Sequence, residues 1–147
     1  LFHLEMADPD REIRGLRRYR NSMNGPRRIQ NNYRHSNLYC DAIVQVGRRR
    51  FSVHRVILTA EMRYFVEVFD QDPRWSIFRV PEESGVTEDA FEEVLNFAYT
   101  GNTDLARNNL TNISHAARVL DYPKLLDFIH DWLLERGRSI RQNRPFL

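Results

Sequence analysis

The chain has 147 residues, a formal net charge of +2, 41% hydrophobic residues and 12% aromatic residues, which suits one globular domain and excludes a disordered chain. No apolar run approaches the about 20 residues that cross a bilayer, and the N-terminus lacks the pattern of a secretory signal. We therefore expect an intracellular protein of the nucleus or cytoplasm that has no membrane partner.

The charge is distributed unevenly along the chain. Eight arginines and four acidic residues precede residue 36, whereas four arginines and no acidic residue follow Glu135. Arginine-rich ends can bind nucleic acid or acidic proteins, and they can equally form a solvated surface.

The first part of the chain predicts two helices. Residues 8–23 begin with an Asp cap and a first-turn proline, and apolar residues follow at helical spacing, which predicts an amphipathic helix. Residues 26–35 predict a second, short helix with Ile29 and Tyr33 four residues apart on one face.

The middle of the chain predicts a small β unit and a helix. Residues 40–46 are rich in β-branched side chains and end at Gly47, and residues 50–53 can return as the second strand of a hairpin. Residues 54–69 are apolar at helical spacing, and residues 75–80 predict a further strand.

The last third predicts three helices. Thr87 caps the first of them, which carries two acidic residues in its first turn and stops at Gly101. Two more follow, and the second begins at Pro123 and ends before Gly137. The apolar positions expected to face inward in these two helices are Leu110, Ile113, Ala117, Leu120, Leu126, Ile129, Trp132 and Leu133. The fold class is α+β: a small β-sheet flanked by a cluster of α-helices and preceded by an extra N-terminal amphipathic helix.

Chemistry-bearing motifs are few. The chain has one cysteine, and its five histidines are scattered, so no zinc-ligand spacing arises. There is no glycine-rich phosphate loop and no nucleophile elbow. Cys40 and His54 are a conceivable nucleophile and base, but a thiol in a buried strand is more often inert. We expect neither enzymatic activity nor a cofactor.

Five blocks of sequence resemble one known family. Residues 38–44 (LYCDAIV), 54–60 (HRVILTA), 64–69 (YFVEVF), 90–101 (AFEEVLNFAYTG) and 116–120 (AARVL) are similar, in order and spacing, to the blocks of BTB/POZ domains of the kelch type or zinc-finger type. The resemblance implies a BTB/POZ domain over residues 26–135. Residues 1–25 would be an N-terminal helical extension, and residues 136–147 a basic tail or the start of a linker or helical region.

The resemblance implies a homodimer whose interface uses the helix before the first strand. Asp41 and Arg55 would lie near a charged pocket at the centre of the dimer, where mutual neutralisation lowers the cost of burial. An ordinary ion pair within one chain is the alternative, and both can hold. The interface residues implied are Ile29, Tyr33, Leu38, Asp41, His54, Arg55, Ile57 and Leu58.

The resemblance also implies partner recruitment. Many relatives bind cullin-3 as substrate adaptors of a ubiquitin ligase, and the surface carried over is Phe69, Asp70, Asp72, Pro73, Trp75, Tyr99, Thr100 and Tyr122. Pro73-Arg74-Trp75 stands where many adaptors have an apolar-x-Glu triplet, which puts cullin binding in doubt. The alternative is a dimerisation and co-regulator-binding domain of a nuclear or chromatin-associated protein, in which the core itself does not contact nucleic acid. The N-terminal helix can pack on the domain, reach the second subunit or bind another protein.

Overall fold

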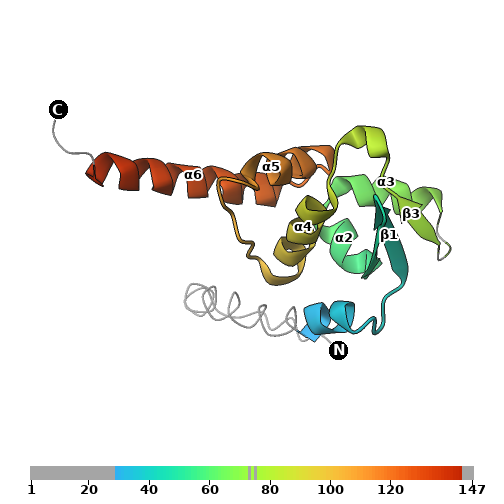
Figure 1. The fold of residues 1–147 in the computed structure, drawn as a ribbon. Helices are drawn as coiled ribbons and strands as arrows, with labels where there is room; N and C mark the ends of the chain where they lie inside the picture. Colours follow the sequence, from blue (N-terminus) through green and yellow to red (C-terminus); the bar gives the residue numbers. More distant parts are fainter. Residues whose placement is uncertain (1–28, 73, 75, 144–147) are drawn as a thin grey trace, which may run out of the picture.

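The structure is a computed structural model that describes residues 29–72, 74 and 76–143, with side chains to residue 138. The amphipathic helix predicted over residues 8–23 lies outside these residues. Residues 29–35 are helical, as predicted. The elements that follow are β1 (Ala42–Val46), β2 (Arg49–Val53), α2 (Arg55–Glu61), α3 (Arg63–Gln71), β3 (Ile77–Arg79), the short 3-10 helix η1 (Glu82–Ser84), α4 (Glu88–Thr100), α5 (Leu110–Val119) and α6 (Pro123–Asn143) (Figure 1). The α+β fold class is confirmed.

The described strands form one three-stranded sheet in the order β2-β1-β3. The predicted hairpin is confirmed, because β1 and β2 are antiparallel and Val46 pairs with Arg49 across a two-residue turn. Gly47 opens that turn with a φ of 59°, a conformation in which a side chain is strained. β3 joins the other side of β1 in parallel, after the crossover through α2 and α3. It is shorter than the strand predicted over residues 75–80.

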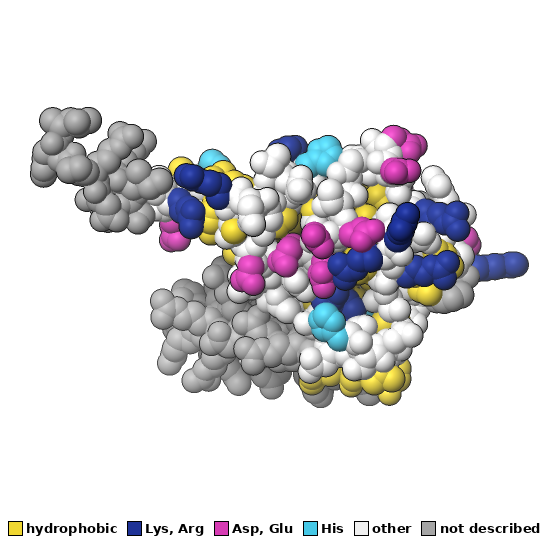
Figure 2. All heavy atoms as spheres, in the orientation of Figure 1, with side chains coloured by type: hydrophobic (Ala, Val, Ile, Leu, Met, Phe, Trp, Pro, Cys, Tyr) yellow, Lys and Arg dark blue, Asp and Glu magenta, His cyan; other side chains and the backbone are white. Residues whose placement is uncertain are grey.

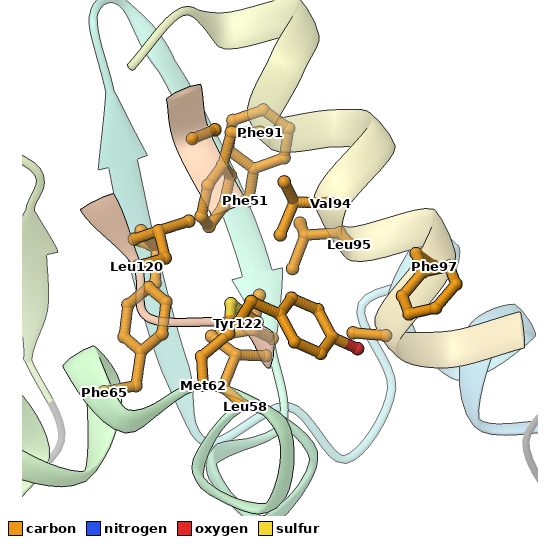
Figure 3. Packing of buried hydrophobic residues seen from close by; sticks show 14 of the residues in the cluster. Phe51, Leu58, Met62, Phe65, Phe91, Val94, Leu95, Phe97, Leu120 and Tyr122 are labelled. Atoms are coloured by element: carbon orange, nitrogen blue, oxygen red, sulfur yellow. The ribbon is translucent and has the colours of Figure 1, made fainter. Parts of the chain in front are cut away.

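The core lies between one face of the sheet and the helices (Figure 3). Alternate residues of β1 are buried, namely Ala42, Val44 and Val46, so one face of the sheet is apolar. The buried residues of α4 are Ala90, Phe91, Val94, Leu95, Phe97, Ala98 and Tyr99. Phe91 packs against Phe51 of β2 with ring centroids 5.1 Å apart.

The predicted helix over residues 54–69 is two helices in the structure. Met62 interrupts it with an extended backbone (φ −126°, ψ 119°) and is fully buried. The N–H groups of Arg63 and Tyr64 then donate to the carbonyls of Asp121 (3.2 Å) and Leu120 (3.3 Å). The turn between α5 and α6 thus supplies acceptors for amides that begin a helix and have no partner within it.

Helix α6 differs from its prediction at the C-terminal end. It continues to Asn143 instead of ending before Gly137, since a glycine costs a helix only about 1 kcal/mol and does not break it. Leu125 and Ile129 are buried, whereas Leu133, predicted to face inward, is 47% exposed. The reason is that the second half of α6 projects beyond the body of the domain (Figure 1), away from the other described helices and strands.

Replacing the cap of α4 should destabilise the fold measurably. The Thr87 hydroxyl accepts a hydrogen bond from the N–H of Ala90 at 3.2 Å. Thr87→Ala is expected to lower the free energy of unfolding by about 1 kcal/mol in urea titrations. Thr111→Ala, at an exposed position of α5, is the control and should leave that free energy unchanged or slightly higher. Equal effects of the two substitutions would show that the cap does not contribute.

Candidate functional site

One part of the surface exposes several large apolar side chains together. This apolar face consists of Ile29, Leu38, Tyr39 and Val56, which are 51%, 48%, 79% and 69% exposed. Figure 2 shows hydrophobic side chains gathered along the lower edge of the domain, where residues 29–35 and the loop after them lie in Figure 1. Tyr33 packs its ring against that of Tyr39 with centroids 5.0 Å apart. Because such clusters are unfavourable in water, they mark interaction surfaces.

The structure divides the predicted interface residues into surface and core. Ile29, Tyr33 and Leu38 contribute to the surface, whereas Leu58 is fully buried and Ile57 and His54 are 8% and 9% exposed. Leu58 therefore packs in the core of its own chain and does not line the apolar face. Sequence reasoning missed Tyr39 and Val56. Val56 belongs to the apolar stretch of residues 54–69, but on α2 its side chain is 69% exposed.

Asp41 and Arg55 contact each other in a way that the sequence did not predict. The Asp41 carboxylate accepts the backbone N–H of Arg55 at 2.7 Å, so it caps α2 from outside the helix. The Arg55 guanidinium does not pair with that carboxylate. It donates to the backbone carbonyls of Asp41 (3.2 Å), Asp72 (3.2 Å) and Arg74 (2.6 Å).

The Arg55 side chain therefore joins three segments of the chain. Its guanidinium carbon also lies 5.0 Å from the ring centroid of Phe69 and 5.1 Å from that of Phe78, where the negative ring faces attract a cation. We call this arrangement the Arg55 clamp. It holds the start of β1, the start of α2 and the loop before β3 together, and it differs from the ion pair within one chain that was one of the two alternatives.

His54 and Tyr99 form a buried polar pair behind the apolar face. The Tyr99 hydroxyl lies 2.9 Å from the backbone nitrogen of His54 and 2.7 Å from its Nδ1, and Nε2 lies 3.0 Å from the carbonyl of Leu38. A carbonyl only accepts, so Nε2 carries the proton and Nδ1 accepts from Tyr99. Burial raises the pKa of Tyr99 well above its ordinary value, which keeps the phenol protonated.

Cys40 lies beside this pair without the features of a nucleophile. Its Sγ is 3.7 Å from Nε2 of His54, so the structure does bring together the two residues that the sequence suggested. However, Nε2 already donates to Leu38. Burial, followed by the charge of Asp41, raises the pKa of the thiol, whereas a reactive cysteine needs a lowered one.

The residues predicted for cullin binding do not form one surface. Phe69, Tyr99 and Tyr122 are 5%, 0% and 0% exposed, and the Tyr122 hydroxyl donates to Glu61 at 2.8 Å inside the domain. Asp70 is exposed, while Asp72 and Thr100 are partly exposed. Pro73 and Trp75 lie outside the described residues. These residues were carried over from the family resemblance, and Phe69, Tyr99 and Tyr122 belong to the hydrophobic core of this chain.

A groove of about 650 Å³ lies where α2, α3 and α6 meet. Glu61 lies in its lining with a side chain 2% exposed, and the Lys124 ammonium donates to it at 3.4 Å. Val66 of α3 adds an apolar side chain that is 38% exposed. We call this cavity the α2–α3 groove. Its lining residues are Thr59, Ala60, Glu61, Met62, Arg63, Val66, Glu67, Asp121, Pro123 and Lys124. Sequence reasoning missed it, because it depends on the break at Met62.

Two further kinds of site were sought in the described part of the chain. Within it, no three His, Cys, Asp or Glu side chains gather closely enough to hold a metal ion. No helix there is both long enough and apolar enough to cross a membrane.

Comparison with known proteins gives one consistent result. The family described as BTB/POZ domain matches residues 30–136. The chain is 33% identical over 106 residues to zinc finger and BTB domain-containing protein 7A of Gallus gallus, covering 72% of this chain and 19% of that protein. It is 28% identical over 108 residues to Kelch-like protein 1 of Mus musculus, covering 74% of this chain and 14% of that protein. The chain thus spans a fifth or less of the length of these curated relatives.

A solved structure agrees with this result at the level of the fold. The BTB domain of zebrafish PATZ1 superposes with a TM-score of 0.66 at 18% identity, covering 88% of this chain and 98% of that chain.

Loosening the Arg55 clamp should weaken the domain. Lysine keeps the charge but cannot reach three carbonyls at once, so Arg55→Lys is expected to lower the free energy of unfolding by about 1–3 kcal/mol. Arg63→Lys is the matched control, since Arg63 is exposed and its side chain forms, among the described residues, one ion pair, with Glu67 at 3.9 Å, and it should cost about 0.5 kcal/mol or less. Urea unfolding followed by circular dichroism measures both. A clamp variant as stable as the control would contradict the assigned role.

Proposed function

Because this chain belongs to the BTB/POZ domain family, we propose that it is a protein-interaction module that pairs with a second copy of itself and recruits a partner protein. The module would span residues 26–135, between the extension 1–25 and the basic segment 136–147. The interaction would take place in the nucleus or cytoplasm, where the proposed partners are found.

The observation that carries self-pairing is the apolar face. Its four large side chains are between 48% and 79% exposed. Ile29 lies in the helical residues 29–35, Leu38 and Tyr39 lie in the loop after them, and Val56 lies on α2, whose preceding residue His54 contacts the carbonyl of Leu38 at 3.0 Å. A two-fold interface brings the same patch of both subunits together, so it needs a surface that complements itself, and an apolar one satisfies this requirement.

The helical residues 29–35 give a second argument. Most of the stability of a helix in a protein comes from packing one face against its surroundings. This helix is held by the contact of Tyr33 with Tyr39 and by Arg34, whose guanidinium donates to Asn96 of α4 at 3.0 Å. Ile29 still points outward at 51% exposure, and a second subunit would cover it.

Cullin-3 is the partner that we propose first. Similarity to kelch-like proteins supports it, and Asp70 at the end of α3 offers an exposed carboxylate on the expected surface. The absence of a glutamate in Pro73-Arg74-Trp75 argues against it.

The alternative partner is a co-regulator of transcription. The α2–α3 groove favours it, because the groove combines the apolar Val66 with charged side chains and is large enough for several side chains of a bound peptide. Similarity to zinc-finger BTB proteins supports the same alternative.

Charges placed on the apolar face should separate the subunits. Ile29→Asp or Tyr33→Asp is expected to give monomer or aggregate in sedimentation velocity, because a carboxylate would be buried in the interface. Leu134→Asp is the control: Leu134 is 48% exposed but lies on α6, so this variant should remain a dimer. A well-folded dimer of both face variants would refute the proposed interface.

Binding to cullin-3 can be tested with the purified N-terminal region of cullin-3. The unaltered protein should bind in isothermal titration calorimetry, and Asp70→Arg should weaken binding by about tenfold or more. Asp104→Arg, at another exposed carboxylate, should bind like the unaltered protein. If the unaltered protein does not bind, the cullin proposal is wrong and the co-regulator alternative is favoured.

A further inference from the structure

A second groove, of about 250 Å³, runs beside β2. We call it the basic groove. Residues 34, 35 and 37 line one part of it, residues 49–52 of β2 line another, and Glu92 of α4 completes it. Figure 2 shows histidine, arginine and acidic side chains meeting just above the apolar lower edge of the domain. The groove is built within one chain, so it does not depend on self-pairing.

The strand that lines the groove has an open edge. In the sheet order β2-β1-β3, β2 pairs with β1 alone among the described strands. Val46 and Arg49 flank a two-residue turn and form a hydrogen-bonded pair, and such pairs alternate along an antiparallel ladder. The backbone N–H and C=O groups of Arg50 and Ser52 therefore point away from β1, on the side where these residues line the groove.

The groove also contains a buried positive charge without a carboxylate. Arg34 is 7% exposed, and its guanidinium donates to amide oxygens of Asn31 (2.7 and 3.1 Å) and Asn96 (3.0 Å). No carboxylate of the described residues forms an ion pair with it. Burial lowers the pKa of Arg34, and the nearby charge of Glu92 opposes this shift only in part, since removing a cation from water is unfavourable.

The other charges leave the groove positive. Arg49 forms ion pairs with Glu92 at 3.0 Å and with Asp89, outside the groove lining, at 3.8 Å. Arg50 is exposed and has no carboxylate partner in the described part of the chain. Three arginines and one glutamate line the groove, which leaves a surplus of two positive charges. A ligand that fits must carry negative charge and hydrogen-bonding groups for a strand edge.

We propose that the basic groove binds an extended acidic peptide, which adds a strand to β2 and places carboxylates beside Arg34 and Arg50. Backbone pairing gives such a peptide its affinity, and every second side chain faces the same way, which gives selectivity. Carboxylates pair with guanidinium groups in two parallel hydrogen bonds. A nucleic acid fits less well, because the strand edge would stay unpaired.

The test uses a fluorescein-labelled heptapeptide in which glutamate and valine alternate. Fluorescence anisotropy should show binding to the unaltered protein, and Arg50→Glu should weaken it by about tenfold or more. Arg118→Glu is the matched control: Arg118 is exposed on α5, away from the groove, and this variant should bind like the unaltered protein. Thermal unfolding of both variants checks that the fold is retained.

A second probe tests the strand pairing. The same heptapeptide with N-methyl groups on alternate residues cannot donate to a strand edge, and it should lose binding. The proposal is overturned if the first peptide does not bind at about millimolar concentration, if Arg118→Glu weakens it as much as Arg50→Glu, or if the methylated peptide binds equally well. It is also overturned if only a single-stranded oligothymidylate binds and Arg50→Glu weakens that binding.

Discussion

The hydrogen bonds at the start of α2 hold the domain together. There the Asp41 carboxylate caps the helix, Tyr99 of α4 bonds to His54, and the Arg55 clamp reaches the loop before β3. The residues before β1, the start of α2, the loop before β3 and the end of α4 therefore meet at His54 and Arg55. Each bond satisfies a polar group that would otherwise be buried without a partner, and leaving one unmade costs more than a typical bond contributes. The positions of β1, α3 and α4 relative to α2 follow from this junction.

The same junction explains why the apolar face is exposed. His54 and Arg55 turn their polar groups inward, toward Tyr99, Leu38 and the carbonyls, so the neighbouring Val56 is left on the outside. The Leu38 carbonyl accepts a hydrogen bond from His54, while the Leu38 side chain is exposed to solvent. The start of α2 therefore contributes in two ways. The polar groups of His54 and Arg55 stabilise the fold, and the apolar side chains of Val56 and Leu38 beside them are available for self-pairing.

Sequence reasoning was accurate where the structural cause is local. Thr87 and Gly101 bound α4 as predicted, and Gly47 opens the predicted hairpin, because caps and turns depend on a few adjacent residues. It failed where the partner lies far along the chain. The break at Met62 depends on the carbonyls of Leu120 and Asp121, about sixty positions away. For the same reason the hydrogen bonds from the Arg55 guanidinium to the carbonyls of Asp72 and Arg74 were not predicted. Phe69 and Tyr99 were carried over as surface residues from the family resemblance, and both are buried.

The parallel pairing of β1 with β3 has a consequence for the order of folding. The β1–β2 hairpin closes over two residues, whereas β3 can reach β1 only after α2 and α3 have folded back across the intervening chain. Contacts between distant residues form late, since the entropy of closing the loop must be overcome first. The Arg55 clamp bonds to Arg74, three residues before β3. The hydrogen bonds of the guanidinium thus hold the loop before β3 beside α2. They couple the β1–β2 hairpin, α2, α3 and β3 into one cooperative folding unit.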